Sequence, residues 1–167
     1  ALFDIPNKQA ALRARLRRHL RSKGCGCLQE SVWISPHSID FAQPTADKKR
    51  IDAKSFLLLE GRPCGGESDE EIVAAAWDFR SINQAYTEYL SILAARPKAK
   101  ILTEDKANHF RKWAIRERAA WLKAASMDPF LPPVLQPHSY LGKEAWDKRV
   151  AAWRNAATRL RLFKPPS

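Results

Sequence analysis

The first 36 residues constrain the fold most, because strand-like and helix-like patterns alternate within them. An apolar segment, residues 1–3, runs into Asp4-Ile5-Pro6, a basic helix-like segment follows, and a second strand-like segment spans residues 27–35 before Pro36. Short alternating apolar runs predict strands, and apolar residues four apart predict a helix. The segment therefore predicts a β-α-β unit with one acidic residue at the end of its first strand.

The predicted helix has an apolar face and a basic face. Its apolar face carries leucines four residues apart, namely Leu12, Leu16 and Leu20. This spacing packs one side of a helix against a sheet. Asn7 is the expected N-cap, and Gly24 is the expected stop beyond the C-terminus of the helix.

A row of arginines, Arg13, Arg17 and Arg21, follows the neighbouring face of this helix. Arginine suits bidentate contact with phosphate, and side chains one turn apart can follow a nucleic acid backbone. A solvated face, or one that pairs with acidic groups elsewhere, explains the same pattern, because no aromatic side chains alternate with the arginines for base stacking. Both interpretations stay open.

Further strand and helix patterns complete the first half. Residues 44–54 are consistent with a short helix, residues 38–41 with a strand, and residues 56–61 begin with a continuous apolar run typical of a buried strand. The order βαββαβ is the ferredoxin-like split pattern. We therefore expect an α+β fold, with a ferredoxin-like domain over residues 1–65 and an all-helical domain over residues 66–167.

The first expected helix of the helical domain begins at Ser68, where a capping-box pattern precedes an acidic first turn. This helix is expected to run to about Ala95, and a second helix from Thr103 to just before Pro129. Each carries an apolar stripe at helical spacing. The stripes consist of Ile72, Ala76, Phe79, Ile82, Tyr86, Tyr89 and Leu93 in the first helix, and of Ala107, Phe110, Ala114, Trp121 and Ala125 in the second.

Four prolines between residues 128 and 137 predict a non-helical turn before a last helix. That helix is expected to span about residues 143–162. Its expected inward side chains are Trp146, Val150, Trp153 and Leu160. The tryptophans of the chain mostly fall on such stripes, so we expect them in the core, and a pocket for an aromatic ligand is the alternative that explains the same residues.

Composition narrows the class of protein. The chain has 167 residues and a formal net charge of +11, which favours polyanions as partners. Its apolar runs are too short to span a membrane, so we expect no association with membranes, and the odd number of cysteines fits a reduced, cytoplasmic setting. The cysteines are odd in number, which disfavours a disulfide framework, and the Cys25-x-Cys27 pair has poor spacing for zinc.

The sequence shows no pattern of enzyme chemistry. It contains no glycine-rich phosphate loop and no H-E-x-x-H motif, and its four histidines are scattered. Asp4 sits at a strand end, where a metal ligand would be useful, but one carboxylate is too few for metal catalysis. A carboxylate that caps the turn before the first helix explains Asp4 as well. We expect no catalytic residue, no metal and no cofactor.

Three groups of motifs resemble those of PaaX-type transcriptional repressors. The first resembles their central domain and comprises Phe3-Asp4-Ile5-Pro6, the arginine-rich helix, Gly24 and Leu28-Gln29-Glu30-Ser31-Val32-Trp33-Ile34-Ser35-Pro36. The second and third resemble the W-D-L…Y…F helix and the D-P-x-L-P segment of the family. They comprise Trp77-Asp78-Phe79, Tyr86 and Tyr89, and then Asp128-Pro129-Phe130-Leu131-Pro132, Leu135-Gln136-Pro137 and Gly142. The chain departs from the family pattern at two places. Tyr140-Leu141 stands where the family has Trp-Pro, and Leu122-Lys123 stands where paired arginines are expected.

The resemblance implies the effector-sensing and dimerisation portion of a repressor of aromatic-acid catabolism. An acyl-coenzyme A such as phenylacetyl-coenzyme A would release the repressor from DNA. Operator DNA would be bound by a winged helix-turn-helix domain that is not in this chain, and the protein would be a homodimer. The ligand-binding residues expected on this basis are Trp77, Asp78, Tyr86, Trp121, Lys123 and Asp128.

The first segment is also similar to the ferredoxin-like nuclease-family subunit of CRISPR spacer acquisition. A strand-end aspartate and a Q-x-S-V strand recur there, as Asp4 and Gln29-Glu30-Ser31-Val32 do here. This similarity implies the alternative of a metal-dependent nuclease or nucleic-acid-binding protein, with Asp4 as a metal ligand. That subunit is a single small domain, whereas this chain adds a long helical half.

Overall fold

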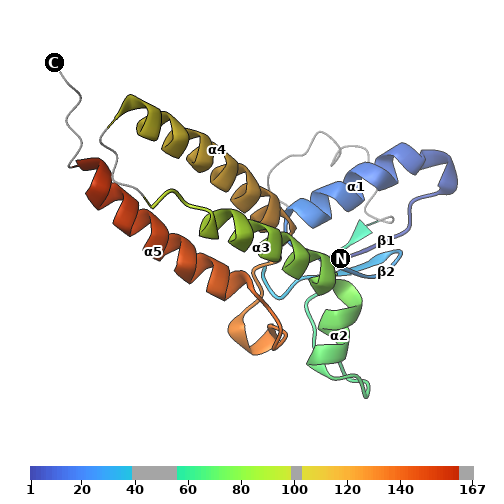
Figure 1. The fold of residues 1–167 in the computed structure, drawn as a ribbon. Coiled ribbons are helices and arrows are strands. Elements are labelled where there is room, and N and C mark those ends of the chain that lie inside the picture. The colour runs from blue at the N-terminus through green and yellow to red at the C-terminus, as the bar shows by residue number, and fades with distance from the viewer. Residues whose placement is uncertain (39–55, 99–102, 162–167) are drawn as a thin grey trace. The chain divides into compact units, whose positions relative to one another are not determined.

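The computed structural model describes residues 1–38, 56–98 and 103–161 (Figure 1). The chain packs as two compact units, which we call the sheet unit and the helical unit. The sheet unit comprises Ala1–Asp78 and Pro129–Pro137, and the helical unit comprises Phe79–Asp128 and His138–Ser167. Each predicted domain is one continuous stretch of sequence, whereas each unit consists of two separate stretches. The predicted domain boundary after residue 65 stays a prediction.

The sheet unit holds a small antiparallel sheet with strand order β2-β3-β1-β4. The strands are β1 (Leu2–Phe3), β2 (Gly26–Gln29), β3 (Val32–Ile34) and β4 (Phe56–Leu57). This order places the first strand in the middle of the sheet, as a ferredoxin-like fold requires. The predicted α+β class, with a ferredoxin-like part and a helical part, is confirmed.

The single strand predicted over residues 27–35 is wrong. The segment folds back on itself as the β2–β3 hairpin, because the chain turns at Glu30-Ser31 and Gln29 pairs with Val32. A register shift between Cys27 and Gln29 accommodates the tight turn. The predicted helix over residues 44–54 lies outside the described residues. So does the predicted strand near residues 38–41, except for residue 38.

Helix α1 (Ala10–Ser22) covers the sheet as predicted, with its three leucines buried. They pack with Phe3, Ile5, Cys25 and Trp33 in one apolar core. Gly24 has a φ of +77°, the left-handed conformation that ends helices at little cost to glycine. The predicted N-cap at Asn7 is wrong, because residues 7–9 form a short 3₁₀ turn and the helix begins after Gln9.

Helix α2 (Asp69–Ala76) starts with the predicted capping box, in which Ser68 and Glu71 exchange hydrogen bonds. The single helix predicted from Ser68 to Ala95 is wrong, because Trp77 adopts an extended conformation and ends α2. The Trp77 indole N–H donates to the Gly24 carbonyl at 3.0 Å. A Cβ atom on Gly26 would lie 2.6 Å from the Trp77 ring, so glycine permits this packing.

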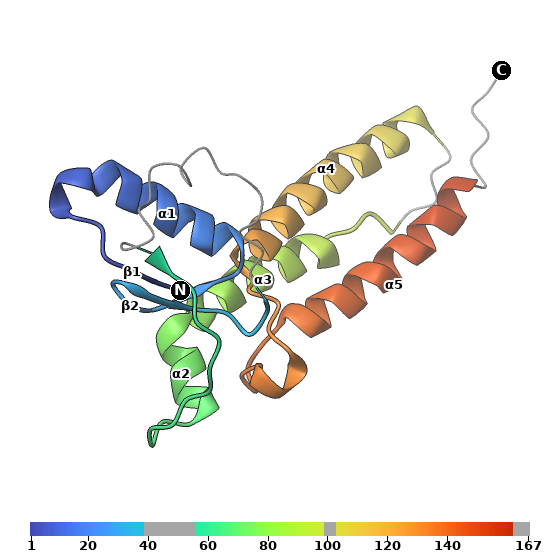
Figure 2. The same ribbon diagram turned by 180° about the vertical axis from the view of Figure 1, so that it is seen from behind.

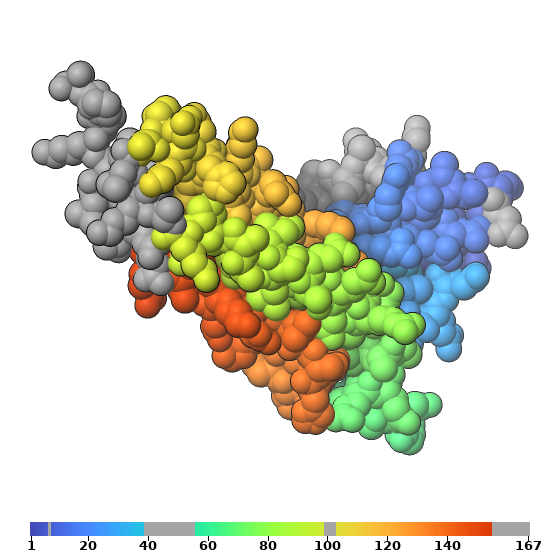
Figure 3. All heavy atoms as spheres, viewed as in Figure 1, coloured from blue at the N-terminus to red at the C-terminus, as the bar shows by residue number. Residues whose placement is uncertain are grey.

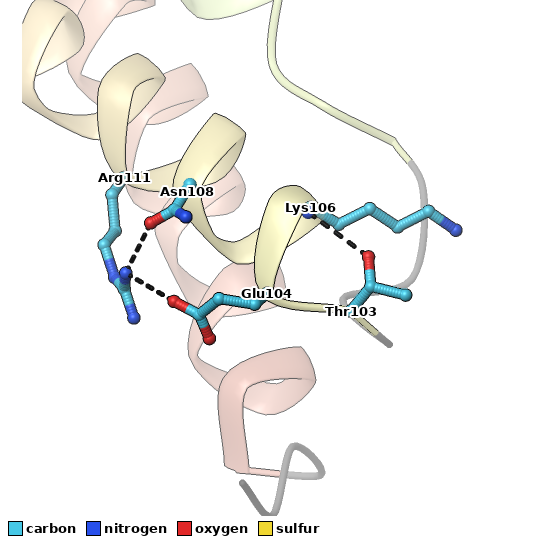
Figure 4. A network of polar contacts seen from close by, with 5 residues as sticks. All are labelled: Thr103, Glu104, Lys106, Asn108 and Arg111. Carbon is cyan, nitrogen blue, oxygen red and sulfur yellow. Dashed lines mark hydrogen bonds and ion pairs between the residues drawn. The ribbon is translucent and has the colours of Figure 1, made fainter.

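The helical unit consists of α3 (Phe79–Ala94), α4 (Glu104–Met127) and α5 (Gly142–Arg161). Helix α3 packs against both α4 and α5. The predicted start of α4 is confirmed, because the Thr103 hydroxyl accepts a hydrogen bond from the Lys106 amide (Figure 4). Arg111 then bridges Glu104 and Asn108 across the first turns of α4.

The inward side chains of these helices follow the predicted stripes in part. The buried set of the helical unit includes Ile82, Ala85, Tyr86, Tyr89, Leu93, Ala107, Phe110, Trp113, Ala124 and Ala145. Trp146, predicted to point inward, is half exposed at 51%, and Ala145 is buried instead. Trp153 is only partly buried, and the side chain of Leu160 lies outside the described residues.

The proline-rich segment belongs to the sheet unit and contains one 3₁₀ turn, η2 (Pro133–Leu135). The predicted non-helical turn is confirmed in part, because the segment contains no α-helix but does contain this 3₁₀ turn. The Phe130 carbonyl lies 3.2 Å from His37 Nε2, and Gln136 Nε2 donates to the Leu131 carbonyl at 2.8 Å. In the parts of the chain described above, we find no helix long and apolar enough to cross a membrane.

Candidate functional site

The helical unit encloses polar groups that an ordinary apolar core avoids. Glu117 of α4 is fully buried, and Asp128 is 6% exposed directly after the same helix. A buried carboxylate is costly unless hydrogen bonds or an opposite charge compensate for its lost hydration. Each of these two carboxylates is the centre of a separate network.

Asp128 accepts hydrogen bonds from two tyrosines. The hydroxyls of Tyr86 and Tyr140 both donate to its Oδ2 atom, each at 2.5 Å. Burial, and then the bond to the carboxylate, raises the pKa of each tyrosine above its ordinary value. The rings of Tyr86 and Tyr140 also meet edge to face, with centroids 6.2 Å apart. The pair and Asp128 thereby tie α3 to the segments that flank α4 and α5.

Glu117 is held by one tyrosine and one arginine. Tyr89 donates its hydroxyl to Glu117 Oε1 at 2.9 Å, and Arg149 of α5 donates its Nε to the same atom at 2.9 Å. The second oxygen, Oε2, has no partner among the described residues. The Arg149 guanidinium also lies over the Trp121 ring, 4.9 Å from its centroid. Burial, and then the bond to Glu117, raises the pKa of Tyr89.

A groove lies between α4 and α5, next to this second network. Its volume is about 790 Å³, a size typical of small-molecule sites. Its lining consists of Ala114, Ile115 and Arg118 from α4 and of Arg149, Val150, Trp153 and Arg154 from α5. Figure 3 shows the atoms of α3 between those of α4 and α5 on the face in view, and Figure 2 shows the three helices from behind. The groove thus combines an apolar floor with three arginines.

The six predicted ligand-binding residues fall in both units. Tyr86, Trp121, Lys123 and Asp128 belong to the helical unit, and Trp77 and Asp78 to the sheet unit. The structure brings Tyr86, Asp128 and Trp121 together, because the Tyr86 and Trp121 rings are 6.1 Å apart. Lys123 lies on the surface and pairs with Glu88 at 2.9 Å, and this pair lowers the pKa of Glu88. The role of the six as ligand residues stays a prediction.

The arginines of α1 make contacts within the sheet unit. Arg17 donates to the Glu30 carbonyl at 3.0 Å, and the Arg21 guanidinium lies 5.3 Å from the centroid of the Trp33 ring. Arg13 also has a partner within the protein. These contacts fit a structural role for the arginine face, and contact with phosphate stays a prediction.

Asp4 lies exposed after the first strand. Among the residues that the structure describes, no three or more His, Cys, Asp or Glu side chains are placed to hold a metal ion. All three cysteines are free thiols, with Cys25 buried and Cys64 exposed. The metal site that the nuclease alternative requires has no support in the described geometry.

The first part of the chain is similar to a known family. Residues 1–73 match the model of the PaaX protein central Cas2-like domain. Over these residues, which make up less than half of the chain, the protein resembles that domain. The match supports a PaaX-type regulator at the level of the family, and the term Cas2-like does not favour the nuclease alternative.

Among solved structures, the chain is similar to the uncharacterized protein Rv0674 from Mycobacterium tuberculosis, with a TM-score of 0.66 and 21% identity. The alignment covers 95% of this chain and 59% of that one, so the chain spans little more than half of its length. At this identity the likeness concerns the fold, which extends over both units. No curated protein matches the chain.

The groove and the buried glutamate were missed by sequence reasoning. A signal was present, because Glu117 lies midway between Trp113 and Trp121 at a spacing of four residues. A carboxylate on an aromatic stripe points inward with its neighbours and needs a buried partner. That partner, Arg149, comes from another helix, and only the packing of α4 and α5 reveals it.

Proposed function

We propose that this chain is the effector-sensing and dimerisation portion of a PaaX-type transcriptional repressor of aromatic-acid catabolism. The effector is an acyl-coenzyme A such as phenylacetyl-coenzyme A, and its binding releases the repressor from operator DNA. A DNA-binding domain outside this chain contacts the operator. The match of residues 1–73 to the PaaX central domain carries this proposal.

Two properties of the chain support an acyl-coenzyme A ligand. Its net charge of +11 favours a partner that carries phosphates. Its helical unit joins aromatic rings to arginine side chains, which suits a ligand with an aromatic end and a phosphorylated end. Such a ligand acts as an effector only if it binds one arrangement of the protein better than the other.

The test is isothermal titration calorimetry of the purified chain with phenylacetyl-coenzyme A, acetyl-coenzyme A and free coenzyme A. We expect binding of an acyl-coenzyme A, tighter than that of free coenzyme A. Thermal unfolding provides a second measurement, since ligand at about 100 times its Kd stabilises the folded state by roughly 2.7 kcal/mol. No heat and no thermal shift with any acyl-coenzyme A would reject the effector.

Dimerisation is tested separately, by sedimentation of the chain over a range of concentrations. A dimer at micromolar concentration is the expected result. A monomer at every concentration, with or without ligand, would reject the dimerisation role and leave the calorimetric result unaffected.

A further inference from the structure

We propose that the groove between α4 and α5 binds an amphipathic anion, with an aromatic or acyl body and a phosphate, carboxylate or sulfonate group. That the anion is the acyl-coenzyme A effector rests on the proposed function. The assignment to the groove itself rests on three features of the helical unit, namely its arginines, the support of Arg149 and the apolar floor.

The arginines gather positive charge from two helices in one place. Arg118 comes from α4, and Arg149 and Arg154 come from α5. Arg118 is exposed and makes no hydrogen bond or ion pair with any residue that the structure describes. Neighbouring like charges repel each other, so an anion between them lowers the electrostatic free energy. The planar guanidinium also matches phosphate and carboxylate oxygens in a bidentate geometry.

Arg149 is oriented before any ligand arrives. Its Nε donates to the buried Glu117, and its guanidinium plane is supported by the Trp121 ring. A guanidinium has five N–H donors, and the Nε bond uses one of them. No hydrogen bond joins its outer nitrogens to another residue that the structure describes, and Arg149 lines the groove. A side chain fixed in its binding orientation loses less entropy when a ligand binds, so Glu117 acts as a positioning residue.

The floor of the groove is apolar. Val150 and Ala114 contribute aliphatic surface, and Ile115, which is 70% exposed, also lines the groove. Trp153 lies against Trp113, with ring centroids 5.6 Å apart, so its ring is supported from the core side. An aromatic or acyl body on this floor removes apolar surface from water. A small hydrated anion such as inorganic phosphate lacks such a body, which is why we infer an amphipathic ligand.

The experiment uses two probes that share this chemistry, phenylacetyl-coenzyme A by calorimetry and 8-anilinonaphthalene-1-sulfonate by fluorescence. The test variant is Arg118→Gln, and the matched control is Arg116→Gln, two residues away on the same helix and outside the groove lining. Both arginines are exposed, so both variants are expected to fold, and circular dichroism checks this. A double variant, Arg118→Gln with Arg154→Gln, extends the test.

We expect the control to bind both probes as the wild type does. Arg118→Gln is expected to bind them about fivefold more weakly, and the double variant more weakly still. Binding is also expected to weaken as salt is added. Sulfonate binding that depends on Arg118, without any acyl-coenzyme A binding, would support the groove and reject the proposed effector.

Phenylacetyl-coenzyme A binding that neither variant weakens would support the proposed function and overturn the groove. Failure of both probes to bind would overturn it too. A third result would also overturn the proposal: duplex DNA binds, Arg118→Gln weakens this binding, and neither small anion binds. The arginines would then contact a nucleic acid.

Discussion

The two units of this chain bury different chemistry. In the described part of the sheet unit, the core consists of apolar side chains and the thiol of Cys25. The helical unit buries two carboxylates, Glu117 and Asp128. All three tyrosines of the chain also lie there, and each donates its hydroxyl to one of these carboxylates.

This difference separates folding from function. Apolar burial is non-directional, and it suffices to hold a helix on a small sheet. Buried charges cost hydration and are kept where direction matters, so we infer that the polar networks fix how α3, α4 and α5 pack. They also place Arg149 at the groove. We therefore locate ligand response in the helical unit and a scaffold role in the sheet unit.

The largest expected effect is that of Arg149→Ala, because it leaves Glu117 buried without its cationic partner. Loss of one partner of a buried ion pair costs about 3–5 kcal/mol in the free energy of unfolding. Chemical denaturation measures this cost. The matched control is Lys148→Ala, which removes an exposed pair with Glu144 on the same helix and should cost less than about 1 kcal/mol.

A rescue variant sharpens this first prediction. Arg149→Met combined with Glu117→Leu removes both charges and should recover most of the lost stability. Equal and small losses for Arg149→Ala and Lys148→Ala would show that the Glu117 network does not organise the helical unit.

The next effect concerns close packing in the sheet unit. Gly26→Ala would place a Cβ atom 2.6 Å from the Trp77 ring and 2.7 Å from the Ala76 Cβ. We expect a loss of about 1–3 kcal/mol, because side chains or backbone must shift to make room. Gly61→Ala is the control, since a Cβ atom there would meet no atom of the described residues within 4 Å apart from its chain neighbours. Equal stability of the two variants in thermal unfolding would contradict this packing of α2 on β2.

A smaller effect is expected at the start of α2. Ser68→Ala removes the side chain that caps Glu71 and should cost about 1 kcal/mol in a denaturation experiment. Hydrogen bonds from the Ser68 amide and hydroxyl lower the pKa of Glu71 in the folded state. The stability that Glu71 contributes is therefore present above its unfolded pKa of about 4.3 and is lost as pH falls. A Ser68→Ala variant as stable as the wild type at pH 7 would argue against the cap.

The smallest effect on stability is expected from ionisation of the tyrosines. This ionisation also gives the clearest spectroscopic difference between the folded and the unfolded protein. Because the pKa of all three tyrosines is raised, no tyrosinate absorbance should appear near pH 10 while the protein stays folded. Their contribution to stability is fully present below pH 10 and declines above it, when the unfolded chain ionises first. Free tyrosine ionisation near pH 10 in a folded sample would contradict the buried networks.

In the sheet unit, the reactivity of two cysteine thiols tests burial in the same way. Burial raises the pKa of Cys25, which is 4% exposed, whereas Cys64 is exposed. With a thiol reagent at pH 8, Cys64 should react first and Cys25 only after unfolding. Equal rates for the two thiols would show that the core of the sheet unit is open.

Local patterns predicted much of this fold. The leucines of α1, the glycine stop and the capping box at Ser68 depend on neighbours in sequence, and all three are confirmed. The β2–β3 hairpin was missed although its pairs are local, because its turn at Glu30-Ser31 lacks the glycine or asparagine that marks most tight hairpin turns. The break at Trp77 was missed because it depends on a partner distant in sequence. Trp77 ends α2 where it bonds to Gly24, 53 residues earlier.

The candidate site was less accessible to sequence reasoning for the same reason. Tyr86 and Asp128 were selected through a family resemblance, and their hydrogen bond joins residues 42 positions apart. The sequence did not predict Arg118 and Arg149 as site residues, since isolated arginines on helices are usually solvated. They form one surface only when α4 and α5 pack.

The central claim is that ligand response belongs to the α4–α5 groove of the helical unit. Hydrogen–deuterium exchange with and without phenylacetyl-coenzyme A tests it most directly. We predict slower exchange in peptides covering residues 110–118 and 146–154, and little change in residues 10–22. Protection confined to the sheet unit, or no protection at saturating ligand, would contradict the account.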